Sequence, residues 1–387
     1  MQEHYTGSLW QCRAMRVLFI NVQCGRGSHG KIAAAQAEKY EQQGHEVKIA
    51  YSRDPDMPEK YKKYAVRIGS TVDIYIHALL TRLTDRNGFF SHMATRRFLK
   101  WADGYNPELL WLHNIHGYYI NIEMLFTWIK SRPSMKVFWT LHDCWPFTGH
   151  CGYFTFAKCD KWRTHCEHCP QKHAYPATFV DNSFRNYDDK RRLFTGVKDM
   201  TLITPSQWLA DLVSQSFLRE YPCEVRHNEI DRNIFRPSAS NFRERCGLTD
   251  KKIVLGVANR WEPRKGIGDF VRLSSMLNPE KFVIVLVGLK HDKLPDSIIH
   301  IDRTSNQQEL VKIYSAADVL FNPTYEDNYP TVNLEAEACG TPVITYDAGG
   351  APETIHGKDS QVIKCGDIEA AKKCIENICE GAVNDND

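Results

Sequence analysis

Residues 322–353 read NPTYEDNYPTVNLEAEACGTPVITYDAGGAPE, and this stretch decides the fold. The short run 318–321 just before it is apolar after its first residue and predicts a buried strand. A polar loop follows, and Pro330 stands where a helix over residues 331–339 begins, with Gly340 closing it. A strand, a loop and a helix in this order predict a parallel α/β sheet. The helix N-terminus can hold a diphosphate without a metal, because its N–H groups and dipole favour negative charge.

Two carboxylates accompany this predicted helix. Glu335 lies one turn inside it, where a carboxylate cannot usefully face a phosphate but can accept hydrogen bonds from two vicinal ribose hydroxyls. Asp327, in the loop before the helix, can do the same for a sugar. The loop and helix therefore predict a nucleotide-sugar site, with Thr331 at the helix start among the donor-binding residues.

These carboxylates also carry a family resemblance. Asp327 and Glu335 are separated by seven residues and followed by Ala-x-Ala-x-Gly-Thr-Pro-Val-Ile, which resembles the E-x7-E signature of the retaining GT-B glycosyltransferases of family four. The first acid departs from that pattern. Asp327 is in register but one methylene shorter, whereas Glu326 is the right residue type one position early. We expect Asp327 to take the motif role, with Glu326 as the alternative.

The resemblance implies the GT-B fold, in which two Rossmann-like, doubly wound parallel-sheet domains face each other across a cleft. Residues 15–227 would bind the acceptor and residues 228–387 the donor, after an N-terminal extension at residues 1–14. The resemblance also implies transfer of a hexose-type sugar from a nucleotide sugar to a glycan or lipid-linked glycan. A UDP-sugar is the donor that it favours. The anomeric configuration would be retained, and the pathway implied is bacterial polysaccharide biosynthesis. Members usually continue with a further helix that crosses back onto the first domain, and this sequence ends before it.

Length and composition limit the number of domains, the class of ligand and the cellular location that the chain can have. A chain of 387 residues can bury two cores of ordinary size. Its formal net charge of +2 argues against a nucleic-acid binder. No apolar run reaches the length of a membrane span, and the first 15 residues lack the apolar region of a signal peptide. We therefore expect a cytoplasmic protein whose 13 cysteines are mostly free thiols.

A strand, a glycine loop, a helix and a second strand open the chain, at residues 16–22, 24–30, 31–43 and 46–51. This order is the start of a doubly wound parallel sheet. The loop contains the pattern G-x-G-x-x-G, which is a dinucleotide fingerprint when a ribose-binding acid follows the second strand. Ser52 and Arg53 stand at that place, and Asp54 comes slightly late.

The same loop resembles the G-S-x-G-K loop of the glycosyltransferase family, which faces the cleft near the donor phosphate. The resemblance implies that Gly27 and Gly30 bind the donor. Two other classes stay open: a nicotinamide-dependent oxidoreductase that uses this loop, and a non-catalytic sugar-nucleotide-binding protein of the same fold. The departure at Asp327 favours the second of these over the first.

Polar residues follow the predicted strand at residues 109–113. His113, Asn114 and His116 stand at its end or just past it. Side chains at the carboxyl end of a parallel strand point into the crevice where such sheets bind ligands. We expect these three residues to line the acceptor pocket.

The predicted strand at residues 137–141 delivers His142 and Asp143 to the same edge. The resemblance implies that His142 contacts the donor sugar or the transferred group. Asp143 would either orient the imidazole, as carboxylates beside a functional histidine commonly do, or cap the following segment.

A helical and basic region is expected over residues 60–104. Most of its Lys and Arg side chains form a solvated face. Because the family's acceptors are often lipid-linked, the resemblance also implies peripheral contact of this domain with an anionic membrane surface.

Residues 144–169, CWPFTGHCGYFTFAKCDKWRTHCEHC, hold five cysteines and three histidines. Cys151, Cys159, Cys166 and Cys169 have the ligand type and closing C-x2-C spacing of a structural tetrahedral zinc site, which catalysis would not require. Free thiols in an aromatic loop and a redox C-x-x-C are the alternatives. The zinc would fix a loop in which Trp145 and other aromatic residues could stack on a sugar acceptor.

The predicted strand at residues 253–258 leads into Asn259-Arg-Trp-Glu-Pro-Arg-Lys-Gly266. The family places an Arg and a Lys five residues apart here, and Arg260 and Lys265 match that spacing, with Arg264 as the competing neighbour. Without a metal, the departing diphosphate needs positive charge from the protein. We expect Arg260 and Lys265 to stabilise it, while His142 and Asp327 hold the sugar.

Overall fold

The structure is a computed structural model that describes residues 13–381 except 54–55, 291–292 and 305. The chain divides into two compact units. Unit 1 comprises Met1–Pro205 and Ala210–Arg226, and unit 2 comprises Ser206–Leu209 and His227–Asp387. The extension expected at residues 1–14 lies outside the described residues up to residue 12. No helix in the described part is both long and apolar enough to cross a membrane.

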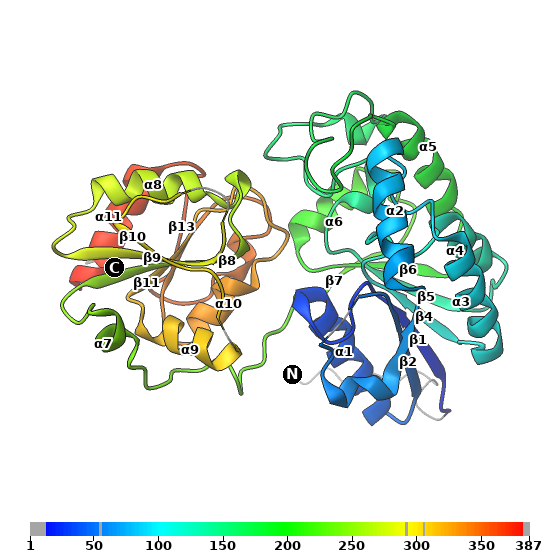
Figure 1. Ribbon diagram of the computed structural model, residues 1–387, viewed down its shortest axis with the longest axis horizontal. Coiled ribbons are helices and arrows are strands. Elements are labelled where there is room, and N and C mark those ends of the chain that lie inside the picture. Colours follow the sequence, from blue (N-terminus) through cyan, green and yellow to red (C-terminus); the bar gives the residue numbers. More distant parts are fainter. Residues whose placement is uncertain (1–12, 54–55, 291–292, 305, 382–387) are drawn as a thin grey trace, which may run out of the picture. The chain divides into compact units, whose positions relative to one another are not determined.

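Unit 1 is built on a sheet of seven parallel strands in the order β3-β2-β1-β4-β5-β6-β7 (Figure 1). The strands are β1 (Arg16–Ile20), β2 (Glu46–Tyr51), β3 (Ala65–Arg67), β4 (Leu109–Leu112), β5 (Lys136–Thr140), β6 (Met200–Thr204) and β7 (Cys223–Val225). The helices of this part of the chain are α1 (Gly27–Gln42), α2 (Thr71–Thr84), α3 (His92–Tyr105), α4 (Ile122–Lys130), α5 (Ser183–Phe194) and α6 (Gln207–Ser214). The strand order reverses between β1 and β4, so their carboxyl ends flank a topological switch point.

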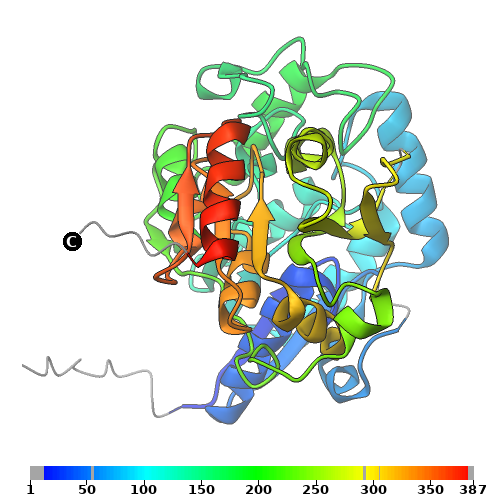
Figure 2. The same cartoon turned by 90° about the vertical axis from the view of Figure 1, so that its left-hand side faces the viewer.

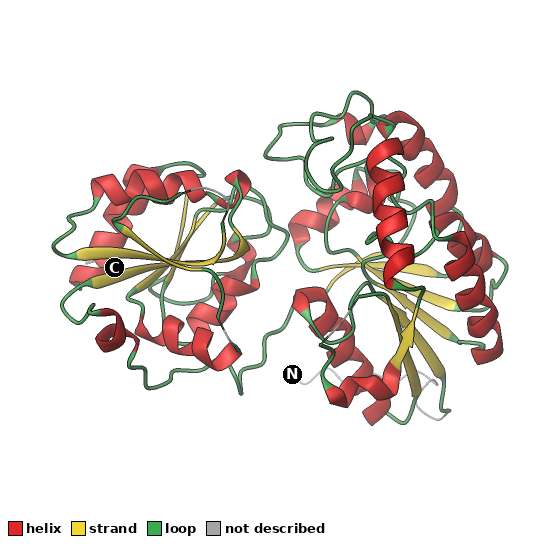
Figure 3. Ribbon diagram, viewed as in Figure 1, coloured by secondary structure: helices red, strands yellow, loops and turns green. Residues whose placement is uncertain are grey.

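Unit 2 is built on six parallel strands in the order β10-β9-β8-β11-β12-β13. The strands are β8 (Lys252–Arg260), β9 (Phe282–Leu289), β10 (Ile298–Ile301), β11 (Val319–Asn322), β12 (Val343–Tyr346) and β13 (Gln361–Ile363). The helices are α7 (Phe242–Cys246), α8 (Ile267–Met276), α9 (Gln307–Ala316), α10 (Thr331–Ala338) and α11 (Ile368–Glu380). In each unit, strands form the centre and helices lie outside them (Figure 3).

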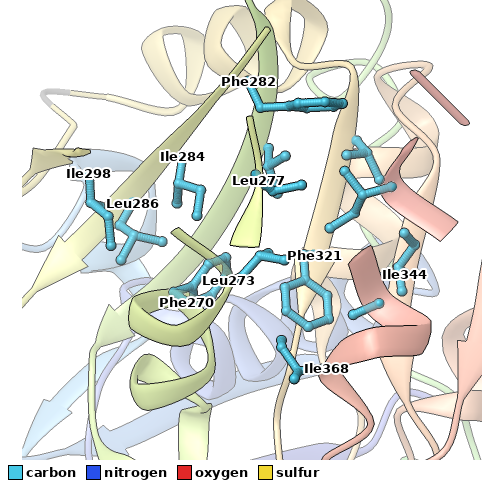
Figure 4. Close-up of a cluster of buried hydrophobic side chains, with 14 of the residues drawn as sticks. Phe270, Leu273, Leu277, Phe282, Ile284, Leu286, Ile298, Phe321, Ile344 and Ile368 are labelled. Atoms are coloured by element: carbon cyan, nitrogen blue, oxygen red, sulfur yellow. The ribbon is translucent and has the colours of Figure 1, made fainter. Parts of the chain in front are cut away.

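The core of unit 2 has one layer on each face of its sheet. Alternate residues of a strand point to opposite faces, so Val254 of β8 joins one cluster and its neighbour Leu255 the other. The first cluster packs Phe270 and Leu273 of α8 and Ile368 of α11 against β9 and β11 (Figure 4). Figure 2 shows α11, in red, lying along this sheet. The second cluster lies under α7, α9 and α10. Because both faces are covered, the central strands are continuously apolar.

The doubly wound parallel-sheet fold is confirmed for both units. Two local expectations differ from the structure. The region 60–104 is not helical throughout, because it begins with the 3-10 helix η2 (Glu59–Tyr64) and strand β3 before α2 and α3. The first helix begins inside the glycine loop, at Gly27 and not at Lys31.

Candidate functional site

Three loops of unit 2 follow strands that are neighbours in its sheet. The loop after β8 contains η5 (Pro263–Lys265), the loop after β11 leads into α10, and the loop after β12 leads into η6 (Pro352–Thr354). Since all three strands are parallel, their carboxyl ends meet at one edge of the sheet. This is the edge at which open α/β sheets bind ligands.

Glycines allow these loops to touch. Gly266 has φ +77°, and a Cβ there would lie 2.2 Å from the carbonyl oxygen of Pro323. Gly349 has φ +62°, and a Cβ there would lie 2.2 Å from the carbonyl oxygen of Asp327. The N–H of Gly350 donates to that same oxygen over 2.9 Å. The three loops therefore pack backbone against backbone, and larger side chains would separate them.

Lys265 and Asp327 form an ion pair between two of these loops. Burial acts to raise the pKa of the Asp327 carboxyl, but the charge and hydrogen bond of Lys265, with Arg264 nearby, lower it below the ordinary value. Arg264 donates to the backbone carbonyl of Glu326 over 3.2 Å and pairs with Glu262 over 3.2 Å. Lys265, which is expected to meet the diphosphate, and its neighbour Arg264 thus lie beside the expected motif acid.

Arg260 and Glu326 differ in exposure. Arg260, the last residue of β8, is exposed at the same sheet edge. Glu326 is completely buried, whereas its neighbour Asp327 is only half-buried and faces Lys265. Of the two acids that compete for the motif role, Asp327 is therefore the one beside the basic loop.

The helix α10 begins at Thr331, after Pro330, with no acidic residue in its first turn and no side chain capping its first N–H groups. Its positive end therefore meets no carboxylate of its own first turn. One turn further, Glu335 accepts a hydrogen bond over 3.0 Å from the hydroxyl of the buried Tyr314 on α9. This contact fixes the direction of the carboxylate.

In unit 1, His113 and His142 meet at the carboxyl ends of β4 and β5. Nδ1 of His113 lies 3.0 Å from Nε2 of His142, and the two rings stack. The ring of His29 lies 5.8 Å from that of His142. Burial, then the neighbouring histidines, holds the pKa of His142 well below its ordinary value, so this ring is neutral at pH 7.

Asn114 and His116 lie beside this pair, and both line one small cavity together with His113, His142 and Asp143. Nε2 of His116 lies 2.8 Å from Oδ2 of Asp143, whose other oxygen accepts the N–H of Trp145 over 2.9 Å. The carboxylate thus orients His116 and also holds the backbone of the segment that follows it.

Gly27 and Gly30 both lie in the first turn of α1, which follows β1 after the loop at residues 21–26. Gly27 has φ +63°, and its missing side chain leaves room for the amide of Gln23, which a Cβ would meet at 2.6 Å. His29 lies between these two glycines, and no sequence pattern singled it out as a site residue. Its position inside the glycine loop was the only signal available in the sequence.

Trp145, expected to stack on a sugar acceptor, lies deep in unit 1. The indole is buried, and the ammonium of Lys190 lies 3.6 Å from its ring centre. That ammonium, itself buried, donates to the carbonyls of Trp145 and Thr148 over 2.8 and 3.0 Å. Trp145 nevertheless lines the same small cavity as His113, Asn114 and His116, so its role toward an acceptor stays a prediction.

All four cysteines expected to bind zinc line one small cavity. A hydrogen bond from Cys151 lowers the pKa of the Cys169 thiol to about 7, while burial raises that of Cys166 to about 12. His150 lines the same cavity: its Nδ1 lies 2.5 Å from Asp85, and its buried Nε2 has no hydrogen-bond partner. As placed, no three His, Cys, Asp or Glu side chains of the described residues form a group that could hold a metal ion.

Acidification is expected to destabilise unit 1, because burial lowers the pKa values of His77 and His113 from 6.5 to about 3. Below pH 6.5 the unfolded chain binds protons at these residues and the folded chain does not. The free energy of unfolding therefore falls with decreasing pH, by about 2 kcal/mol per histidine at pH 5. Urea unfolding as a function of pH measures this loss. His77→Gln should make the pH dependence shallower, and an unchanged slope would contradict the assignment.

Residues 238–386 match the family of glycosyl transferases group 1. The chain is 24% identical over 369 residues to the putative colanic acid biosynthesis glycosyl transferase WcaC of Escherichia coli K12, covering 90% of this chain and 87% of that protein. Its fold is similar to that of sucrose-phosphate synthase from Thermosynechococcus elongatus, with a TM-score of 0.67, 14% identity and coverage of 95% and 90%. It is also similar to HepE of Anabaena, solved in complex with UDP and glucose, with a TM-score of 0.63, 16% identity and the same coverage. Residues 238–386 therefore form a glycosyl transferases group 1 domain, and the chain has the GT-B fold.

Proposed function

We propose that the protein transfers a hexose-type sugar from a nucleotide-sugar donor to a glycan acceptor, with retention at the anomeric carbon. The donor that we favour is a UDP-sugar. The observation that carries the proposal is the convergence of three loops at one sheet edge, where Lys265 and Asp327 pair beside the start of α10. Positive charge, an uncapped helix N-terminus and a sugar-binding carboxylate are the groups that a nucleotide diphosphate sugar requires.

In this proposal the donor diphosphate binds at the N–H groups of the first turn of α10, from Thr331 onward. Arg260 and Lys265 compensate its charge, and Glu335, held by Tyr314, accepts hydrogen bonds from the ribose hydroxyls. The acceptor hydroxyl attacks the anomeric carbon from the face that the diphosphate leaves. The sugar–phosphate bond breaks, and the hydroxyl proton passes to the departing phosphate oxygen. Stabilising that departing charge is the main catalytic contribution of unit 2.

Unit 1 is proposed to bind the acceptor and to contribute His142 to the transferred sugar. A neutral imidazole, held by His113, can donate one hydrogen bond to a sugar hydroxyl without bringing a charge. The polar cavity lined by Asn114 and His116 would receive the acceptor. We propose a glycan acceptor of polysaccharide biosynthesis, free or lipid-linked, used in the cytoplasm. A lipid-linked acceptor would bring the protein to the cytoplasmic face of a membrane.

The direct test is donor binding and hydrolysis by the purified protein with a panel of UDP-, GDP- and ADP-sugars. We expect one UDP-sugar to bind and to be slowly hydrolysed, with release of UDP. Nuclear magnetic resonance of the transfer product reports whether the anomeric configuration is kept. Binding of no member of the panel would overturn the proposal, and an inverted product would overturn its retaining step.

A non-catalytic protein of the same fold is the alternative that the shorter Asp327 keeps open. Asp327→Glu separates the two, because restoring the longer acid should raise turnover in an active site and do nothing in a scaffold. A nicotinamide cofactor finds less support, since Ser52 and Arg53 follow β2 where the ribose-binding acid is expected and Asp54 lies outside the described residues. Quenching of cofactor fluorescence that is lost in Gly27→Ala would restore that alternative.

We also propose a structural zinc ion at Cys151, Cys159, Cys166 and Cys169. Their shared cavity supports it. Burial lowers the pKa of Lys190 to about 7, while thiolates at Cys166 and Cys151 favour its charged form, which would balance their negative charge. Metal binding would have to draw the thiols closer together than they are placed.

Elemental analysis of the purified protein should find about one zinc ion per chain. Cys166→Ser should release it and weaken acceptor use while leaving nucleotide binding by unit 2 intact, because metal binding is coupled to the order of this loop alone. Cys246→Ser, at an exposed cysteine outside the loop, is the matched control and should keep the metal. Absence of zinc together with free reactivity of all four thiols would show that no site exists.

A further inference from the structure

A cavity of about 320 Å³ lies in unit 1, apart from the residues described above. Arginines from three segments line it: Arg163 of η4 (Lys161–Arg163), Arg191 of α5, and Arg219 between α6 and β7. All three side chains are exposed. Pockets that bind small molecules usually have a volume of about 300 Å³ or more. The cavity is therefore large enough for a ligand of the size of a sugar.

The positive charge of this cavity is not balanced by neighbouring acids. In the part of the chain that the structure describes, none of the three arginines forms an ion pair. The acids of α5 have other partners. Asp188 lies 3.0 Å from Nε2 of His165, and Asp189 lies 2.7 Å from a guanidinium nitrogen of Arg86. Because guanidinium groups bind carboxylates and phosphates through two parallel N–H bonds, the cavity favours an anion.

One acid, Glu220, also lines the cavity. Its Oε1 accepts the N–H of Gly196 over 2.7 Å, in the turn that follows α5. This carboxylate is therefore held by the backbone, and none of the three arginines is its partner. Three arginines and one glutamate leave a formal charge of +2 among the lining residues.

An aromatic pair forms the apolar part of the cavity. The rings of Tyr187 and Phe217 meet edge to face, with their centres 5.2 Å apart. Tyr187 is buried, and its hydroxyl donates to the carbonyl of Trp162 over 3.1 Å, which ties η4 and its Arg163 to α5. Phe217 is only half-buried. An aromatic face beside cationic groups suits a sugar ring that carries an acidic substituent.

This cavity is separate from the one proposed for the acceptor. Arg191 and Arg219 lie toward the amino ends of β6 and β7, because α5 and the segment after α6 lead into these strands (Figure 1). His113 and His142 stand at the carboxyl ends of β4 and β5, which is the opposite edge of a parallel sheet. The two cavities share no lining residue. A ligand in one therefore leaves the other open.

We propose that this cavity is a second carbohydrate site, which binds a sugar that carries a carboxylate or a phosphate. The three guanidinium groups bind the anionic group, and Phe217 packs against the sugar ring. No bond is made or broken there. A glycan with acidic units would gain affinity by engaging this site in addition to the acceptor cavity. The proposal goes beyond the transfer reaction, and binding at this site does not depend on it.

The test is isothermal titration calorimetry of the full chain in buffer free of phosphate. The probes are glucuronate, glucose 1-phosphate, glucose and inorganic phosphate. We expect at least one anionic sugar to bind more tightly than glucose, and the tighter of the two identifies the anionic group. No binding of either anionic sugar, or equal binding of glucose, overturns the proposal. Inorganic phosphate that binds as tightly as glucose 1-phosphate would overturn its carbohydrate part.

Two variants locate the binding in this cavity. Arg191→Gln should weaken the binding of the anionic sugar about tenfold, because a charge-assisted hydrogen bond is lost. Phe217→Leu keeps an apolar side chain without a ring face, so it should weaken sugar binding and leave the binding of inorganic phosphate unchanged. Arg185→Gln is the matched control, since Arg185 is an exposed arginine of the same helix that pairs with Asp189. This variant should bind as the wild type does.

A last variant separates this site from the candidate donor site. Lys265→Ala removes a charge from unit 2 and should not weaken the binding of glucuronate or glucose 1-phosphate. Binding that is lost in Lys265→Ala and unchanged in Arg191→Gln would assign the ligand to the donor site and overturn the proposal. Because no sugar is transferred in these measurements, that outcome leaves the proposed transfer reaction standing.

Discussion

Replacing Lys265 by alanine is expected to lower the turnover number for sugar transfer about a hundredfold or more. The ammonium would compensate the charge that develops on the departing diphosphate, and a preorganised positive group acts most strongly in that transition state. The change also leaves the Asp327 carboxylate without its ion-pair partner. The rate constant of single-turnover transfer, measured with the donor identified in the panel, reports the effect.

Two control variants separate this role from a general loss of stability. Lys358→Ala removes an exposed lysine of the same unit and should leave the rate constant within about twofold, since an exposed lysine contributes little. Lys265→Arg keeps the charge and should recover part of the lost rate. If Lys265→Ala were to turn over as the wild type does, the diphosphate would have to be stabilised by other groups.

The strands were predictable where burial on both faces makes the sequence continuously apolar. β2 has the bounds expected from residues 46–51, and β4 ends one residue before the strand expected at residues 109–113. The start of α1 was harder to predict, because glycine is a poor helix former and usually marks a loop. Here Gly27 and Gly30 lie within the first turn because the helix starts directly against the backbone and side chain of Gln23.

The candidate site was predictable where its residues belong to one local motif or end neighbouring parallel strands, as His113 and His142 do. The spacing of Arg260 and Lys265 and the loop before α10 are both local patterns. By contrast, the contact of Glu335 with Tyr314 spans 21 residues, and the hydroxyls of Tyr325 and Tyr346 both donate to Asp269, more than 50 residues earlier in the chain. Pairings of this kind arise from the strand order, which no spacing in the sequence reveals.

The helix α2 shows the limit of periodicity most directly. Its apolar spacing indicates an amphipathic helix, but it does not say which side is buried. His77 decides the matter through its bonds to Ser91 and Gly88, so the apolar side faces outward. Sequence rules would place such a side in the core, and only the tertiary contacts of one histidine show otherwise.

Replacing His142 by alanine is expected to lower the turnover number about a hundredfold, with a smaller effect on donor affinity. The ring lies at the carboxyl end of β5, positioned by Nδ1 of His113 over 3.0 Å. Because the pKa of His142 is held well below its ordinary value, the imidazole stays neutral between about pH 6 and 8. Its contribution to the rate of transfer should therefore be constant over that range. Any inflection near pH 6.5 in the pH–rate profile of the wild type should also be present in the profile of the variant.

His173→Ala, at an exposed histidine of the same unit, is the matched control and should transfer sugar as the wild type does. His113→Phe keeps an aromatic ring against His142 but removes the nitrogen that positions it. We expect this variant to lose turnover while its donor dissociation constant changes little, because His113 acts through His142 and touches no substrate itself. If His142→Ala lost donor binding in proportion to its loss of rate, His142 would be a binding residue for the donor and not a group whose contact strengthens in the transition state.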